Sequence, residues 1–269
     1  MRFVLTLLLL ALFAFNTSAT PIVGGSPSVL PAGKFMNETH ITYTNFTAQW
    51  NPTDEEYVDF PDDQSASSFV LIPQFYYGPT DWLSLRLTIP VLGLSQDLGE
   101  DQSAFGIGDI VFDPKFKIWW SDNRDIRVSG AVGARFPTGN TDSEIPLGDG
   151  STDFVWVLLP SEKVCQFTFY QNLGMWINGE NENGDDIDDV LFYNLTVEWN
   201  ASPKFGTLVE IQGGNTLGDS DASSLHIAPG LYYNVSKSLM LDACIEIPIA
   251  DKGGRLFAAK PYVGFYIVW

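Results

Sequence analysis

The fold is decided by the last ten residues, "KPYVGFYIVW" (260–269), in which apolar side chains recur at every second position. The outward set is Val263, Phe265, Ile267 and Trp269. Successive side chains of a strand point to opposite faces, so this pattern predicts a strand with one apolar face. Chain ends are usually polar and loosely held. A final strand of this kind indicates a closed barrel, in which the last strand pairs with the first and no edge stays open.

The same period of two recurs along most of the chain, and most of the alternating segments are ten residues or longer. Strands of soluble sheets are shorter, usually about 5–6 residues, whereas tilted strands that cross a bilayer need about 9–11. The predicted fold class is therefore all-β, a transmembrane antiparallel up-and-down β-barrel of about 12 strands. The expected strands are 39–50, 68–77, 82–91, 109–120, 126–136, 152–159, 164–177, 190–199, 205–214, 224–235, 239–249 and 256–269.

The connections between these segments alternate in length. Long polar ones are expected at 51–67, 92–106, 138–151, 178–188 and 213–222, with short ones between them. Transmembrane barrels sort their connections in this way, with short periplasmic turns and long external loops. Aromatic residues gather beside the short turns, where an interfacial girdle would lie. They are Trp82, Trp119, Trp120, Trp199, Tyr233 and Trp269.

Charge and the first residues bear on location. The chain has 14 Lys and Arg against 33 Asp and Glu, which argues against nucleic acid as a partner because phosphate binding needs clustered cations.

Arg2 precedes an apolar run, 3–15, that is shorter than the ~20 residues of a membrane-spanning helix. This predicts a signal peptide at 1–19, cleaved after Ala19, and export to the outer membrane of a Gram-negative bacterium. Residues 20–38 would then form an N-terminal arm, a candidate lumenal plug, and residues 39–269 the barrel.

Four stretches resemble one bacterial outer-membrane family, known by the name MetA-pathway of phenol degradation or as transporter-like. They are "FGIGDIVFDPKFKIWW", "VGARFPTGNTDSEIPLGDGSTDF", "NLGMWINGE" and "HIAPGLYYNVSKSLMLDACIEIPI", and the resemblance runs over about 105–269. It implies an outer-membrane barrel that passes small, apolar or aromatic molecules. It brings no catalytic or binding residues with it.

The end of the chain carries a second resemblance. Gly264, Phe265, Ile267 and Trp269 are similar to the carboxy-terminal signal by which the barrel-assembly machinery recognises its substrates. The other expected partners are outer-membrane lipid and a small-molecule solute, and we expect a monomer.

The lumen is the candidate functional region. Inward positions of the third to fifth expected strands carry a basic wall of Arg86, Lys115, Lys117, Arg127 and Arg135, among which Asp109 and Asp113 are interspersed. Inward positions of the eighth to eleventh carry an acidic wall of Glu198, Glu210, Asp242 and Glu246. Two interpretations stay open: a salt-bridged interior that fills the barrel, or a transverse field across a narrow pore.

Other functions leave weaker traces. An outer-membrane hydrolase would need a serine beside a histidine; Ser224 and His226 share a face, but that face is the lumen. A secreted, soluble β-sandwich binding protein is the other alternative.

The acidic segment 178–189 lacks the EF-hand pattern, so no metal site is predicted. No cofactor and no catalytic residue are predicted either. Cys165 and Cys244 are expected on opposite faces of non-adjacent strands, and hence as free thiols.

Overall fold

A computed structural model describes residues 24–51, 54, 56–181, 183–218, 222–253 and 255–269. The predicted signal peptide, 1–19, and residues 20–23 of the arm lie outside the described residues. Within the described ranges, no helix is long and apolar enough to cross a membrane.

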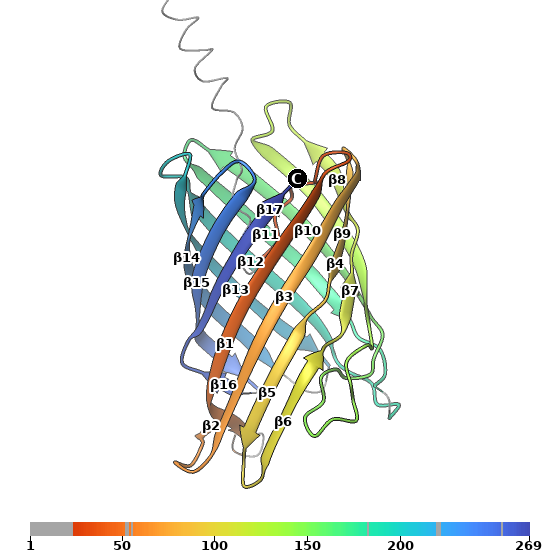
Figure 1. Ribbon diagram of the computed structural model, residues 1–269, viewed down its shortest axis with the longest axis vertical. Coiled ribbons are helices and arrows are strands. Elements are labelled where there is room, and N and C mark those ends of the chain that lie inside the picture. Colours follow the sequence, from red (N-terminus) through yellow and green to blue (C-terminus); the bar gives the residue numbers. More distant parts are fainter. Residues whose placement is uncertain (1–23, 52–53, 55, 182, 219–221, 254) are drawn as a thin grey trace, which may run out of the picture.

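The chain forms one continuous antiparallel sheet that curves into a barrel (Figure 1). Its strand segments are β1 (Phe35–Asn51), β2 (Glu56–Asp59), β3 (Ser65–Thr80), β4 (Leu83–Thr88), β5 (Val91–Asp97), β6 (Asp101–Ile107), β7 (Ile110–Phe112), β8 (Lys115–Trp120), β9 (Ile126–Phe136), β10 (Asp153–Val164), β11 (Phe167–Ile177), β12 (Asp189–Trp199), β13 (Phe205–Leu217), β14 (Ser223–Asn234), β15 (Leu239–Lys252), β16 (Arg255–Phe257) and β17 (Lys260–Val268).

These segments make twelve barrel strands in the described residues, because β2 continues as β3, β4 as β5, β6 as β7 and β8, and β16 as β17. The first and last strands pair in antiparallel register, Met36 opposite Val268 and Thr42 opposite Tyr262. Backbone bonds between Phe35 and Trp269, 3.1 Å in each direction, extend this seam to the terminus. The predicted closed barrel of about 12 strands is confirmed, and a two-sheet sandwich is excluded because the ring has no open seam.

Three details of the sequence prediction are wrong. The first strand begins at Phe35 rather than at residue 39. The segment 92–106, expected as a polar loop, is mostly the hairpin of β5 and β6, whose polar side chains pair across it, such as Gln96 with Gln102 at 2.6 Å. A bulge between Lys117 and Trp119 changes the parity of β8, so Trp120 turns inward and donates to the Ser129 hydroxyl at 3.3 Å.

The two faces of the wall have opposite chemistry. Large apolar side chains such as Phe169, Leu195 and Leu241 lie on the outer surface and are 40–50 % exposed. Buried polar residues such as Asn194 and Thr196 fill inward positions of the same strands. A soluble protein places these classes the other way round, since apolar area favours a water-free environment. This arrangement is favourable for a barrel whose outer face is in contact with lipid.

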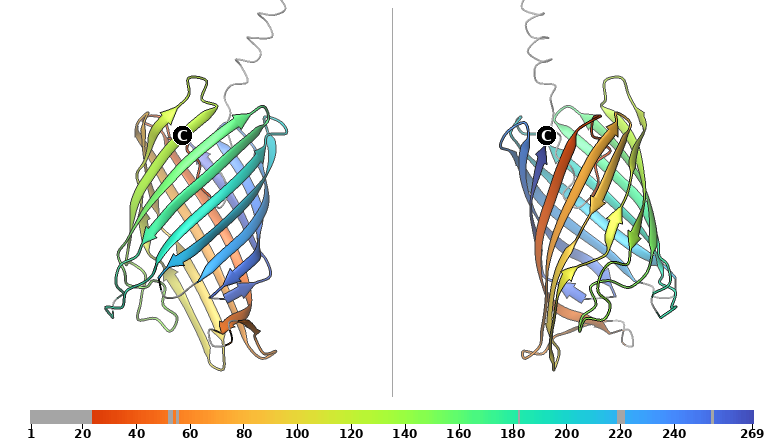
Figure 2. Two further views of the ribbon diagram at one scale, coloured as in Figure 1. Left: turned by 180° about the vertical axis from the view of Figure 1, so that it is seen from behind. Right: turned by 45° about the vertical axis from the view of Figure 1, so that its right-hand side comes forward.

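The connections are sorted between the two ends of the barrel. The carboxy-terminus and the short turns lie at the upper end in Figure 1, and the β5–β6 hairpin and the loop 137–152 lie at the lower end, as Figure 2 shows from two further sides. Trp82, Trp119, Trp199 and Trp269 all stand exposed on segments that reach the upper end. This end therefore has the features of the periplasmic side.

Candidate functional site

The stretch that precedes β1 folds back into the barrel instead of lying outside it. Four of its backbone groups bond to inward-facing side chains of four different strands. Leu30 N donates to Ser84 Oγ at 2.6 Å, and Ser129 Oγ donates to Pro27 O at 2.6 Å. Further along, Lys115 Nζ donates to Ser26 O at 2.9 Å, and Gly24 N donates to Glu210 Oε2 at 2.9 Å. Residues 24–30 thus cross the lumen from the periplasmic rim toward its middle.

The two glycines at the inner end of this stretch allow the close approach. A Cβ at Gly24 would lie 2.6 Å from Asn194 Oδ1, and one at Gly25 would lie 3.1 Å from a methyl carbon of Leu159. Asn172 then binds Gly25 on both sides, accepting from its N–H at 2.6 Å and donating to its carbonyl at 2.9 Å. Glycine is needed here because the backbone packs directly on lumen side chains.

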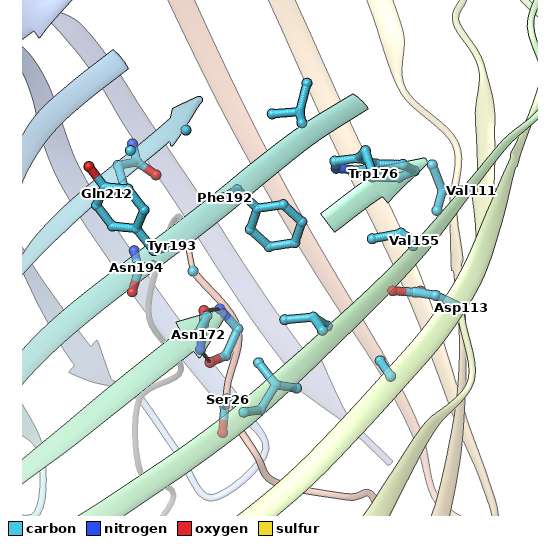
Figure 3. Close-up of a pocket in the computed structure, with 18 of the residues that line it drawn as sticks. Ser26, Val111, Asp113, Val155, Asn172, Trp176, Phe192, Tyr193, Asn194 and Gln212 are labelled. Atoms are coloured by element: carbon cyan, nitrogen blue, oxygen red, sulfur yellow. Dashed lines mark hydrogen bonds between the residues drawn. The ribbon is translucent and has the colours of Figure 1, made fainter. Parts of the chain in front are cut away.

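Next to the tip of the arm lies a cavity of about 540 Å³. Residues 24–26 form one boundary of it. Figure 3 shows Val111, Val155, Trp176 and Phe192 grouped on one part of its wall. Its size falls within the ~300–1,000 Å³ of small-molecule sites, which are mostly apolar with a few placed polar groups.

The apolar wall was missed by the sequence analysis, and it comes chiefly from β10, β11 and β12. Val155, Val157 and Leu159 are the inward residues of β10, whose outward residues are also apolar. Strands of such barrels usually carry apolar side chains on the outer face and polar ones on the inner face, and this part of β10 is apolar on both faces. The run "FVWVLL" at 154–159 was the signal that could have located this wall.

Residues predicted for the basic wall face the lumen together with their own counter-ions. Arg86 binds the carboxylate of Asp113, with Nε 2.6 Å from Oδ1. Arg135 binds Asp149 at 2.7 Å and also the buried Asp153. These acids come from the same sector of the barrel as the arginines, so charge is neutralised locally.

The other three members of the basic wall form no ion pair with a carboxylate in the described part of the chain. Lys115 donates to the arm, as described above. Arg127 donates to the Ser28 hydroxyl at 3.1 Å and to the Arg124 carbonyl at 3.0 Å. The ammonium of Lys117 lies 4.7 Å from the centre of the Trp120 ring, near the periplasmic mouth.

The predicted acidic wall is buried and bound in the same local way. Glu198 accepts from the hydroxyls of Tyr170 at 2.7 Å and Tyr232 at 2.8 Å. Glu210 binds the arm at Gly24 and accepts from Asn194 at 3.0 Å.

The remaining two acids face basic side chains. Asp242 lies 3.3 Å from His40 Nε2. Glu246 binds His226, Lys260 at 3.5 Å and the Tyr262 hydroxyl at 2.6 Å. Each of the four acids is bound by groups near it in the barrel: tyrosine hydroxyls at Glu198, Asn194 and the arm at Glu210, and basic side chains at Asp242 and Glu246.

Both histidines direct their ring nitrogens at carboxylates. His226 contacts Glu246 through Nδ1 and Asp251 through Nε2, the latter at 2.7 Å. His40 lies between Asp242 and Glu38, with Nδ1 3.7 Å from Glu38. Neither ring nitrogen of His226 is therefore directed at Ser224, the serine that shares its face. Cys165 and Cys244 are free, as predicted.

Three residues of the predicted assembly signal, Gly264, Phe265 and Ile267, lie on the closing strand β17, and Trp269 follows its last residue. Phe265 is partly exposed, Ile267 and Trp269 are exposed on the outer face, and Gly264 lies on the inner face opposite His40.

Two sequence motifs form a latch between β7 and the loop 137–152. Thr138 Oγ1 accepts from Ile110 N and donates to Gly108 O, both at 2.9 Å. Asp109 Oδ1 accepts from Gly139 N at 2.9 Å. The Gly-Asp pair at 108–109 and the Pro-Thr-Gly at 137–139 thus bind each other, where β9 has ended and supplies no further partner for the β6–β7 strand.

Leu147 of the same loop completes the latch. Its side chain is buried against the inner face of β6, where a Cβ at Gly106 would come within 2.8 Å of it. The loop therefore folds over part of the lower mouth of the barrel, and a second cavity of about 440 Å³ lies beneath it, beside Pro90, Leu92 and Arg135.

The closed ring with an apolar exterior and a polar, partly filled lumen defines the outer-membrane β-barrel class. The chain belongs to the family described as "Putative MetA-pathway of phenol degradation", which matches residues 24–257. The match extends the resemblance seen in the sequence, 105–269, to the first strands as well. No curated protein matches the sequence.

Solved structures of outer-membrane channels share the fold. The COG4313 outer membrane channel from Pseudomonas putida F1 superposes with a TM-score of 0.79 at 14 % identity, covering 94 % of this chain and 100 % of that one. The Ralstonia pickettii toluene transporter TbuX gives 0.53 at 10 % identity, with 93 % and 95 % covered. The CymD monoaromatic hydrocarbon channel gives 0.51 at 9 % identity, with 89 % of each chain covered.

Proposed function

We propose that this protein is a passive channel for the uptake of small apolar or aromatic molecules across the outer membrane of a Gram-negative bacterium. The observation that carries this proposal is the cavity with its apolar wall of Val155, Val157 and Phe192 inside an otherwise polar lumen. A channel for ions or sugars has no use for such a wall, because polar solutes lose hydration beside it. The channels for toluene and monoaromatic hydrocarbons that share the fold support the same solute class.

The setting of the channel follows from its surface. Outer-membrane lipid covers the apolar exterior, the assembly machinery recognises Gly264, Phe265, Ile267 and Trp269, and the signal peptide at 1–19 directs export. The protein acts as a monomer, because the lumen is complete within one chain. It has no catalytic role, consistent with the engagement of both histidines by carboxylates.

The arm acts as the plug of this channel. Its inner residues, 24–26, border the cavity, and the rest of the described arm lies on the periplasmic side of them. A solute that enters from the external side reaches the cavity first and meets the arm next. Passage to the periplasm therefore requires the arm to move.

Crystals soaked with 4-bromotoluene test the cavity. We expect an anomalous bromine peak between Val157 and Phe192, because that part of the wall offers the apolar contact. The Val157→Trp variant fills the same space and should lose the peak while keeping the barrel. Bromine found only on the lipid-facing exterior of the wild type, or nowhere, would contradict the proposal.

A further inference from the structure

Among the cations that line the cavity, Lys115 differs from Arg86 and Lys260 in how it is bound. Arg86, Arg135 and Lys260 each contact a carboxylate. Lys115 forms no ion pair with any carboxylate in the described ranges, and its ammonium donates instead to the carbonyl of Ser26 at 2.9 Å. It also faces the ring of Tyr76, with Nζ 5.9 Å from the ring centre. The direct partner of the Lys115 ammonium is thus the arm, while the carboxylates of Asp113 and Glu38 act on its charge at longer range.

Lys115 also lines the cavity, as do Ser26 and the Arg86–Asp113 pair. Lys115 is therefore both an anchor of the arm and part of the polar side of the cavity, as is Asn172, which binds Gly25. The other backbone anchors further along the arm, Ser84 and Ser129, are not among the residues that line the cavity. A molecule in the cavity can reach the bond between Lys115 and Ser26 without first moving the arm.

We propose, on the basis of the proposed channel function, that Lys115 couples occupancy of the cavity to release of the arm, and that the releasing solutes are small aromatics bearing an uncharged hydrogen-bond acceptor. The ring lies on the apolar wall, and the acceptor oxygen replaces the Ser26 carbonyl at the Lys115 ammonium. The ammonium keeps a charge-assisted hydrogen bond in both arrangements, so the exchange leaves its charge satisfied. A hydrocarbon fills the same space but leaves the bond intact.

The exclusion of anions from this class follows from the path to the cavity. The external loops carry a large excess of acids, such as Asp54, Glu56, Asp62 and Asp63 between β1 and β3, and Asp185, Asp186 and Asp188 between β11 and β12. A field of one sign at a mouth repels solutes of that sign. Phenol and toluene form the matched pair for a test, because they have the same number of heavy atoms and differ only in the hydroxyl.

The test reports the position of the arm through a thiol at Val29, whose side chain is buried. Val29→Cys is placed in a background in which Cys165 and Cys244 are both replaced by Ser, and its rate of reaction with a water-soluble maleimide is measured in proteoliposomes. We expect slow labelling without solute, at least about a fivefold faster rate with phenol, and no change with toluene. Lys115→Met should label fast without any solute, and Lys115→Arg should restore the phenol response.

Lys117→Met is the matched control, because Lys117 lies on the same strand but contacts Trp120 instead of the arm. It should behave as the parent does. Equal rates with phenol and toluene, or a protected thiol in Lys115→Met, would overturn the coupling. The bromotoluene peak and aromatic uptake do not depend on this labelling, so their presence with an unchanged labelling rate would reject Lys115 as the coupling residue and leave the channel function standing.

Discussion

Gly264 of the closing strand lies directly opposite His40 of the first strand, and the imidazole of His40 occupies the space where a Cβ at position 264 would lie. The carboxylate of Asp242, on the strand at the other side of β17, lies 2.6 Å from the same point. This glycine therefore joins three strands at the seam of the barrel, in addition to its place in the predicted assembly signal.

Gly264→Ala should weaken barrel closure, because the added methyl group forces His40 and Asp242 apart. Overpacking of this kind costs about 1–3 kcal/mol. Unfolding in urea, followed by the faster migration of folded barrels in unheated SDS samples, measures the loss. Val263→Ala, on the exposed outer face beside it, is the control and should stay near wild type. Equal stability of the two variants would show that the seam tolerates a side chain at position 264.

Gly24→Ala should displace the tip of the arm, because its Cβ would collide with Asn194 and Asn172. Ion conductance in planar bilayers is expected to rise severalfold, with no change in barrel stability. Ala32→Ser, in the exposed part of the arm, should conduct as the wild type does. If the glycine variant conducts no more than this control, residues 24–26 do not obstruct the lumen.

Arg135→Met should destabilise the barrel more than Arg127→Met does. Arg135 is bound to Asp153, whose side chain is fully buried, and loss of one member of a buried ion pair costs about 3–5 kcal/mol. Arg127 bonds only to neutral oxygens in the described chain, and such a loss costs about 1–3 kcal/mol. Urea unfolding of both variants measures the difference. Similar stabilities with a large shift in ion selectivity would favour the transverse field instead.

The loop 137–152 should loosen in acid through Asp149. Burial alone would raise the pKa of this carboxyl group, but hydrogen bonds from the backbone and hydroxyl of Ser151 and the charge of Arg135 lower the pKa below its usual 3.8. A lowered pKa in the folded state stabilises the loop at pH values above 3.8, and this contribution is lost as the pH falls below it. Amide exchange in the loop, corrected for the intrinsic pH dependence, should therefore accelerate in that range. Asp149→Asn should show fast exchange already at neutral pH; an identical profile in both proteins would rule out this role.

Thiol labelling tests the orientation of the barrel. Cys165 lies exposed in the turn between β10 and β11, at the end assigned to the periplasm, and Cys244 is buried. A membrane-impermeant maleimide should label one thiol of the folded protein, only after the periplasm is opened, and two after unfolding. Labelling of Cys165 on intact cells would reverse the assignment of the two ends.

Much of the fold could be predicted because a strand that crosses a bilayer places an apolar side chain toward lipid at every second residue. The alternation in β11 to β15, together with the alternating lengths of the connections, predicted a closed barrel and its number of strands. Alternation within a strand also indicated which charged side chains face inward. The bulge after Lys117 reverses the alternation in β8, so Trp120 lies on the other face. A bulge has no strong composition signal, so counting by two fails after it.

The contents of the lumen could not be predicted in the same way. The residues before β1, "GGSPSVLPAG" at 24–33, show no periodicity, and their position depends on bonds to strands that are distant in sequence. Of the acids that bind Arg86 and Arg135, alternation placed Asp113 among the inward residues, but Asp149 comes from a loop that no sequence pattern places. In the sequence, the apolar wall is visible only at residues 154–159, where the side chains on both faces of the strand are apolar.

Uptake of a labelled aromatic by intact cells tests the central claim most directly. Gram-negative cells that express the protein are compared with cells that express Val157→Arg, which places a charge on the apolar wall of the cavity. With equal amounts of folded barrel in the outer membrane, the wild type should take up phenol at low concentration severalfold faster than the variant and than cells without the protein. Equal initial rates in all three would contradict the account of an aromatic uptake channel.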